Sequence, residues 1–355
     1  MLCPLPLAPS RPLVSVVVPA YNAERWLGKT LLSACSQSLQ DIEILVVDDG
    51  SIDGTAAVAE SFIRRDPRVR LIRRENGGVG AARNTGIAAA KGRYIAPLDA
   101  DDIWHPLKLE SQVECMESGG EDMGFSYCWS EKIDLESNVI AMSFPFETEG
   151  WVRESLILRN FVGSASVPMF RTSALEKSGL YLSRSEQAGV QGCEDWDLCL
   201  RLAESFRVGL VRQTLVGYRQ VPGCMSLDAA SMAKSYEVAM QRAKERNPDI
   251  ARAVFRQSAG IFYSYLVSKC CAANDHAACL RAMVKAIAAD PKLIANRRFH
   301  RMGLKSLMRL LAGSRRGSSC GVAKEENGGS RKAFAEGKGT GSGTTDEVAS
   351  RSSVR

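Results

Sequence analysis

Residues 94–102 read Tyr94-Ile95-Ala96-Pro97-Leu98-Asp99-Ala100-Asp101-Asp102, a short run of β-forming residues that ends in three carboxylates. Consecutive strand side chains point to opposite faces, so this pattern predicts that Asp99 and Asp101 project to the same side. Two carboxylates on one side suit a divalent cation, because Mg²⁺ is usually held by one or two carboxylates together with substrate phosphates. An isolated Asp-x-Asp triplet also fits a solvated acidic loop before a helix, so the surrounding sequence must decide.

The residues before this stretch alternate between strand and helix patterns. Apolar, β-branched runs indicate strands that are buried on both faces, and segments with apolar residues at helical spacing follow each of them. This alternation predicts an α/β fold with a mostly parallel sheet and right-handed crossovers. The predicted strands are Val14–Val18, Ile42–Val47, Val69–Arg73 and Tyr94–Leu98.

Unusual polar residues follow the carboxyl ends of these strands. Tyr21, Asp49 and Asn76 come after the first three strands, and the acidic stretch comes after the fourth. Ligands of parallel sheets bind at this edge, so we expect a binding site there. The glycines of 77–80 lack the GxGxxG spacing directly after the first strand, which excludes a dinucleotide-binding Rossmann dehydrogenase.

The second half of the chain is less regular. Residues 131–192 indicate mixed β-structure with a helical segment at 151–160, and Val208–Leu210 and Leu215–Tyr218 are predicted as two short strands. Glu194, Asp195 and Asp197 stand at the start of an amphipathic helix, where the helix dipole favours acidic residues. The pattern is helical from 229 to 311, with a break near Asp290-Pro291.

The last helical segment, 295–311, combines an apolar stripe with many basic residues. Such helices bind anionic membrane surfaces or acidic partner helices, or they pack on the main domain with solvated arginines. The stripe consists of Leu304, Leu307, Met308 and Leu311. Beyond Gly313 the chain is rich in Gly, Ser and charge, and we expect disorder.

The composition is that of an ordinary globular protein. The 355 residues are 45% hydrophobic, and 46 basic residues against 40 acidic ones give no indication of nucleic-acid binding. No apolar run approaches the ~20 residues that span a bilayer, and residues 1–12 lack the features of a signal peptide. Eleven cysteines without CxxC pairs indicate reduced thiols. We therefore expect a cytoplasmic protein, with 295–311 as a contact to the inner face of the membrane.

Five motifs, in this order and at these spacings, resemble those of family 2 glycosyltransferases with the GT-A fold. The resemblance covers 13–225 and implies a GT-A domain at 13–228. The periodicity and composition of the rest predict a helical C-terminal extension at 229–312 and a disordered tail at 313–355. The motifs are Val18-Pro19-Ala20-Tyr21-Asn22, Val46-Val47-Asp48-Asp49-Gly50-Ser51, Asn76-Gly77-Gly78 through Ala82-Arg83-Asn84, Asp99-Ala100-Asp101-Asp102 and Glu194-Asp195-Trp196-Asp197.

The resemblance implies a role for each residue of a donor site. Pro19, Tyr21 and Asp49 belong to the nucleotide-sugar site, with Asp49 accepting from the base. Arg83 would lie near the diphosphate, Asp99 would contact the ribose or donor sugar, and Asp101 would hold Mg²⁺ or Mn²⁺ between the phosphates. A metal and a cation there would neutralise the charge of the leaving group.

The resemblance also implies an inverting reaction with one general base. Asp195 occupies the base position, Glu194 is the competing candidate, and either can instead serve as a charge at a helix start. Asp102 has no assigned role. The chain lacks the Gln-x-x-Arg-Trp signature of processive synthases, which favours a single addition.

We therefore expect a metal-dependent transferase that moves a hexosyl-type group from a nucleotide sugar to a hydroxyl of a saccharide or lipid-linked acceptor, in polysaccharide or glycoconjugate synthesis. One alternative is a nucleotidyltransferase, which would normally carry a Gly-rich, Arg/Lys-bearing signature after the first strand. Another is a non-catalytic binder of sugar nucleotides or glycans. The intact Asp99, Asp101 and Asp195 argue against the binder.

Overall fold

The structure is a computed structural model, and it describes residues 11–143, 145–184, 186, 189, 192–221 and 228–317. The described residues up to Ala312 belong to one compact unit. Residues 313–317 are the last residues of helix α11, Arg297–Gly317. The rest of the predicted tail lies outside the described residues, as do the first ten residues of the chain.

The amino-terminal half forms the parallel part of one sheet, in the order β3-β2-β1-β4. Val14 of β1 stands opposite Ile42 of β2 and Tyr94 of β4, so all three strands end at the same edge. The strands are β1 (Val14–Ala20), β2 (Ile42–Asp48), β3 (Val69–Arg73) and β4 (Tyr94–Pro97). The predicted α/β architecture is confirmed.

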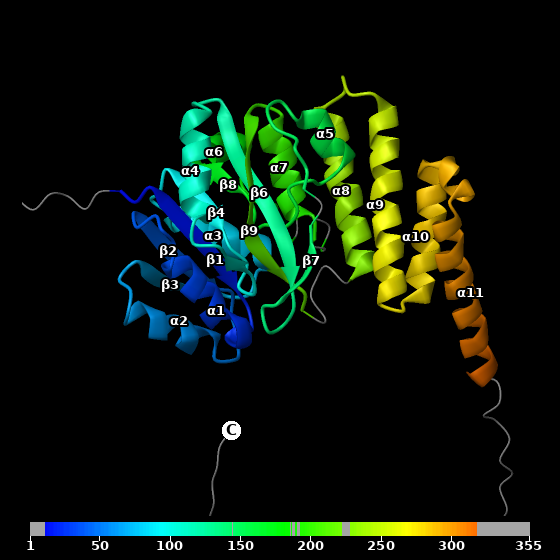
Figure 1. The fold of residues 1–355 in the computed structure, drawn as a ribbon, viewed down its shortest axis with the longest axis horizontal. Helices are drawn as coiled ribbons and strands as arrows, with labels where there is room; N and C mark the ends of the chain where they lie inside the picture. Colours follow the sequence, from blue (N-terminus) through cyan, green and yellow to red (C-terminus); the bar gives the residue numbers. More distant parts are fainter. Residues whose placement is uncertain are drawn as a thin grey trace, which may run out of the picture. The chain divides into compact units, whose positions relative to one another are not determined.

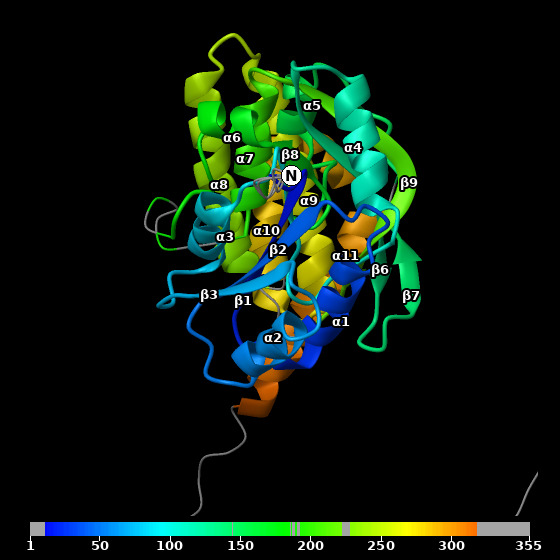
Figure 2. The ribbon, with the colours of Figure 1, turned by 90° about the vertical axis from the view of Figure 1, so that its left-hand side faces the viewer.

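Helices cover both faces of these strands. The crossovers from β1 to β2 and from β2 to β3 move along the sheet in one direction, whereas the crossover from β3 to β4 returns. Right-handed connections therefore place α3 on the opposite face from α1, and Figure 2 shows this arrangement. The helices are α1 (Glu24–Cys35), α2 (Thr55–Ile63) and α3 (Val79–Ala89).

The other half of the sheet is mixed. β8 (Met169–Arg171) pairs antiparallel with both β4 and β6 (Met123–Ile133), and β6 runs parallel to β9 (Arg207–Arg219). The prediction of two short strands at 208–210 and 215–218 is wrong, because β9 is one continuous strand. Its pairing with β6 shifts register near Cys128 and Trp129 of β6. Two short strands complete the sheet, β5 (Ile103–Trp104) on β9 and β7 (Val139–Met142) on β6.

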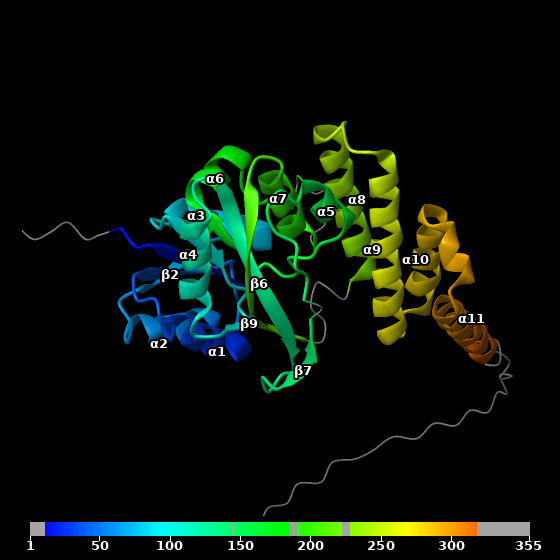
Figure 3. The ribbon, with the colours of Figure 1, turned by 45° about the horizontal axis from the view of Figure 1, so that its top comes forward.

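The remaining helices of this half are α4 (Lys108–Ser118), α5 (Arg153–Leu158), α6 (Thr172–Ser178) and α7 (Glu194–Ala203). Helix α5 is shorter than the predicted segment 151–160. Figure 3 shows α5 close to α7 and α8, beyond the long strands β6 and β9.

The carboxyl-terminal part is helical, as its periodicity predicts (Figure 1). The break near Asp290-Pro291 is confirmed, and two further breaks occur at 247–251 and 273–275, where Pro248 and the left-handed Asn274 interrupt the helical pattern. The elements are α8 (Ala229–Arg246), α9 (Arg252–Ala272), α10 (His276–Ala289), the 3₁₀ helix η2 (Pro291–Ala295) and α11.

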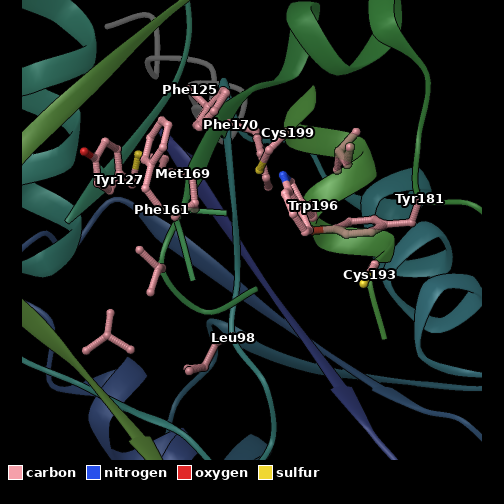
Figure 4. Packing of buried hydrophobic residues seen from close by; sticks show 14 of the residues in the cluster. Leu98, Phe125, Tyr127, Phe161, Met169, Phe170, Tyr181, Cys193, Trp196 and Cys199 are labelled. Atoms are coloured by element: carbon pink, nitrogen blue, oxygen red, sulfur yellow. The ribbon is translucent and has the colours of Figure 1, made fainter. Parts of the chain in front are cut away.

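An aromatic cluster joins α7 to α8 and α9. The ring of Trp196 lies 5.6 Å from that of Tyr236 and 6.4 Å from that of Phe262, and the last two rings stack at 3.9 Å. Figure 4 shows Trp196 within the buried side chains around α7. The helical extension is thus packed on the helix that carries the predicted base Asp195 in its first turn. All eight cysteines in the described part of the chain are free thiols.

Helix α11 packs through one face and exposes another. Phe299 and Ser306 are buried, and the Ser306 hydroxyl lies 3.2 Å from Nδ1 of His276 on α10. The predicted apolar stripe is on a different face, where Leu304 and Leu311 are 58% and 57% exposed. Among the described residues, no helix is long and apolar enough to cross a membrane.

Candidate active site

All eight residues that the sequence predicts for the site line one cavity of about 1210 Å³. Its volume slightly exceeds the range of ~300–1,000 Å³ typical of small-ligand pockets. The cavity opens at the carboxyl ends of β1, β2 and β4 and extends to α7 and α9. The eight residues are Pro19, Tyr21, Asp49, Arg83, Asp99, Asp101, Glu194 and Asp195.

At the ends of β1 and β2, polar residues tie neighbouring loops together. Asn22 has a positive φ of 48° and its side chain accepts from the backbone N–H of Ile52, at 3.0 Å. The buried Asp49 carboxylate accepts from the backbone N–H groups of Gly77 and Gly78, and Arg74 pairs with it at 3.0 Å. Asp49 therefore anchors the glycine-rich loop, and Tyr21 presents a ring that is 53% exposed.

The acidic stretch is a turn and not the continuation of a strand. β4 ends at Pro97, and the N–H of Asp102 donates to the carbonyl of Asp99 at 3.1 Å. The predicted strand alternation is therefore wrong, because these residues are not in a strand. Asp99 and Asp101 nevertheless line the same cavity. Asp102 is fully buried and accepts from Ser166 Oγ at 2.6 Å and from the N–H of Arg219 at 2.9 Å. Asp102 thus fastens the turn to β9.

Asp101 faces the cavity beside other negative charge. Burial, and then the charge of Asp99, raises its pKa to about 6. Among the described residues, no group of three or more His, Cys, Asp or Glu side chains could hold a metal ion by itself. The Asp101 carboxylate, with Asp99 nearby, fits an ion such as Mg²⁺ that takes its other ligands from water and a diphosphate.

Arg83 on α3 joins two acidic parts of the site. The guanidinium is almost fully buried and donates to Asp99 at 2.6 Å and to Glu194 at 3.0 Å. Both of its terminal nitrogens therefore bind carboxylates that belong to separate elements. Such charge-assisted bonds orient the carboxylates as well as neutralise them.

Glu194 and Asp195 differ in their partners. Glu194 is buried and held on both sides, because it also accepts from the N–H of Gly192 at 2.8 Å. Asp195 is half-buried, and its carboxylate accepts from the N–H of Trp196 at 2.7 Å. Burial, and then Glu194, raises the pKa of Asp195 to about 7, with Arg83 opposing. A carboxylate of this pKa on a cavity wall can accept a proton near neutral pH.

Tyr181 is a site residue that sequence reasoning missed. The Arg83 guanidinium lies over its ring, 5.1 Å from the centroid, and in Figure 4 its side chain points towards the start of α7. Asn84 holds this residue in place, because its side chain both accepts from the N–H of Tyr181 and donates to its carbonyl. The only signal was Asn84, which follows Arg83 in the motif but gives no indication of its partner.

The first half of the chain is similar to a known protein family. Residues 15–178 match the family model described as glycosyl transferase family 2. The chain is 30% identical to chondroitin synthase of Escherichia coli over 197 residues, which are 54% of this chain and 27% of that protein. It is 42% identical to the putative teichuronic acid biosynthesis glycosyltransferase TuaG of Bacillus subtilis over 107 residues, 30% of this chain and 42% of TuaG. The chain thus spans less than half the length of these relatives.

A solved structure shares the fold. The structure of S. aureus TarS residues 1–349 in complex with UDP-GlcNAc superposes with a TM-score of 0.52 at 15% sequence identity, covering 86% of this chain and 92% of that one. At this identity the likeness concerns the fold, which includes the curled sheet and its flanking helices.

Proposed function

Since this chain carries a family 2 glycosyltransferase domain and has the GT-A fold, we propose that it moves a sugar from a nucleotide-diphosphate donor to an acceptor hydroxyl, with inversion. The observation that carries this proposal is the single cavity lined by all eight predicted residues. Its nucleoside end is formed by Tyr21 and Asp49 at the ends of β1 and β2. Asp195 stands on the wall formed by α7.

Asp195 is the general base in this proposal. Its carboxylate takes the proton of the acceptor hydroxyl while that oxygen forms a bond to the anomeric carbon of the donor sugar. The bond between this carbon and the diphosphate oxygen breaks, and the electron pair leaves with the nucleoside diphosphate. Glu194 is engaged by Arg83 and Gly192, which favours Asp195 as the base.

Asp101 is the residue we propose for the divalent cation, Mg²⁺ or Mn²⁺. When bound, such an ion neutralises charge on the diphosphate leaving group. The raised pKa of Asp101 supports this assignment, because a nearby cation favours the charged carboxylate that burial disfavours.

Arg83 is proposed to order the sugar site. Because it binds Asp99 and Glu194 together, it fixes the donor-side carboxylate relative to the head of α7. The ring of Tyr181 supports the guanidinium from one side. The carboxylate of Asp99 is then oriented to accept from donor hydroxyls.

The base assignment is tested with Asp195→Asn. We expect the variant to keep donor affinity and to lose transfer by a factor on the order of 10²–10⁴, the usual contribution of a general base. Donor binding is measured as thermal stabilisation by UDP, GDP and dTDP sugars with Mn²⁺, and transfer as nucleoside diphosphate release. Glu114→Gln, on the exposed side of α4, is the control. Full transfer by Asp195→Asn would move the role to Glu194.

The products separate this function from the two alternatives. A glycosyltransferase releases a nucleoside diphosphate, whereas a nucleotidyltransferase releases pyrophosphate or a nucleoside monophosphate. A non-catalytic binder is stabilised by the donor and releases neither. The named relatives, chondroitin synthase and TuaG, support polysaccharide synthesis as the setting.

We also propose that α11 contacts an anionic membrane surface. The exposed stripe of Leu304, Leu307, Met308 and Leu311 adjoins a row of basic residues at helical spacing, Arg301, Lys305 and Arg309. An apolar stripe beside a basic one is the pattern of helices that lie in the membrane interface. This contact would bring the cavity close to a lipid-linked acceptor.

A further inference from the structure

One continuous face of α9 forms a wall of the cavity. The lining residues recur at intervals of three and four, which places them on the same side of the helix. They are Ser258, Ile261, Phe262, Tyr265 and Lys269. Tyr265 is 43% exposed.

This wall is fixed relative to the candidate base. Trp196 follows Asp195 in the chain, its ring contacts Phe262, and its indole N–H donates to the carbonyl of Leu156 on α5 at 2.9 Å. Tyr236 on α8 stacks on Phe262, with 3.9 Å between the ring centroids. A base at the head of α7 and a wall on α9 therefore keep a constant geometry.

The α9 wall lies on the acceptor side if the proposed function holds. The nucleoside end of the cavity is at the strand ends, with Tyr21 and Asp49. In an inverting displacement the acceptor oxygen reaches the anomeric carbon from the side of the base. An acceptor bound beside Asp195 must therefore contact the helices packed around α7. Among the described residues, α9 contributes five residues to the cavity lining, whereas α8 contributes Met232 and α5 contributes Leu158.

The cavity wall contributed by α9 carries a positive charge and no carboxylate, and Arg83, Lys132 and Arg184 place further cations elsewhere in the described lining. Among the described lining residues, the carboxylates are confined to the strand ends and the head of α7, namely Asp49, Asp99, Asp101, Glu194 and Asp195. The positive charge of this wall is that of Lys269. Lys269 lies over the ring of Tyr265, 5.7 Å from its centroid. The wall therefore offers an exposed aromatic ring beside positive charge.

We propose that Tyr265 and Lys269 form an acceptor subsite for an acidic saccharide, one that carries a carboxylate or a phosphate. The ring receives the apolar face of a sugar, as aromatic side chains with a polar edge commonly do. The ammonium group then pairs with the acidic substituent as a compact point charge. This subsite deepens the proposed function and rests on it for the name acceptor.

The test compares probes that differ in one group. p-Nitrophenyl β-glucuronide, the neutral β-glucoside and the glucoside 6-phosphate are titrated into the full chain with UDP and Mn²⁺ present, and their dissociation constants are measured by calorimetry. We expect at least one acidic probe to bind five-fold or more tighter than the glucoside, and which one it is distinguishes a carboxylate from a phosphate. Lys269→Gln should remove this preference and leave glucoside binding unchanged.

Tyr265→Ala should weaken all three probes about ten-fold, while Tyr265→Phe keeps them, because stacking needs the ring. Lys244→Gln, an exposed lysine near the end of α8, is the matched control. Equal binding of acidic and neutral probes by the wild type, or a preference that survives Lys269→Gln, would overturn the subsite. The proposed function is tested separately, because a protein that UDP does not stabilise against unfolding would contradict it. The ratio of the dissociation constants of the acidic and neutral probes decides the subsite in either case.

Discussion

The pH dependence of donor turnover tests the assignment of Asp195 most directly. Its pKa is raised to about 7, by burial first and by Glu194 second. A general base works only when deprotonated, so kcat/KM should fall about ten-fold for each pH unit below this pKa and level off above it. The acidic limb of the profile then reports Asp195 in the free enzyme.

The informative perturbation is Glu194→Gln, which removes the neighbouring charge. At an effective dielectric constant of about 20, two unit charges about 8 Å apart interact by about 2 kcal/mol, or roughly 1.5 pH units. Solvent at the half-buried Asp195 reduces this, and we expect the acidic limb to move down by about one pH unit. Release of Arg83 from Glu194 acts in the same direction, because a nearer cation lowers the pKa of Asp195.

The assay is the kcat/KM of nucleoside diphosphate release between pH 5 and 9, normalised to each variant's own plateau. A limb that stays at the wild-type pH in Glu194→Gln refutes Asp195 as the titrating base. Asp101 then becomes the candidate, since its pKa is raised to about 6 by burial and Asp99, and Glu194 is not among the causes. Glu114→Gln should leave the limb where it is.

Three further predictions concern the metal, the core and the membrane. Asp101→Ala should lose the stabilisation by UDP that depends on Mn²⁺, about 2.7 kcal/mol when the ligand is at ~100 times its dissociation constant; unchanged thermal shifts would remove Asp101 from the metal. Lys108→Met should raise the free energy of unfolding, because the buried Nζ has no hydrogen-bond partner in the structure and burial lowers its pKa to about 7. Between pH 7 and the ordinary lysine pKa of 10.5, the unfolded state binds more protons than the folded state, so the stability of the wild type rises with pH. The stability gained by Lys108→Met is therefore on the order of 2–4 kcal/mol at low pH and becomes smaller as the pH rises. Urea unfolding of both proteins at pH 6 and pH 9 measures this difference, and a gain that does not change with pH would contradict the argument. The double substitution Leu304→Asp and Leu311→Asp should abolish sedimentation of the protein with phosphatidylglycerol vesicles. The control Ile52→Asp changes an apolar residue that is 91% exposed outside α11, and it should leave sedimentation unchanged. Equal sedimentation of both variants would exclude α11 as the membrane contact.

Local sequence accounts for the parallel half of the sheet and the edge that carries the cavity. Each strand there is a continuous apolar run, and each is followed by polar residues that must meet, because parallel strands end at the same edge. The pattern of residues 194–197 likewise predicted a helix that begins with acidic residues. These signals are local, so one sequence suffices to find them.

The long-range partners could not be found this way. Asp102 binds Ser166 and the backbone of Arg219, which are 64 and 117 residues away in the chain. Tyr181 bonds to Asn84, which is 97 residues earlier in the chain, and its ring lies against the guanidinium of Arg83. Periodicity predicts which face of an element is buried, but it says nothing about the element that covers it.

Local sequence patterns suffice to predict the α/β class, the sheet edge that carries the cavity and the charged residues at that edge. The contacts of these charges follow from the folded chain. Arg83 lies between Asp99 and Glu194, Asp102 is buried in the core, and Asp195 lines the cavity to which α9 also contributes. The physical reason is that a carboxylate's role depends on burial and on its neighbours. Both are set by elements that lie far apart in the chain.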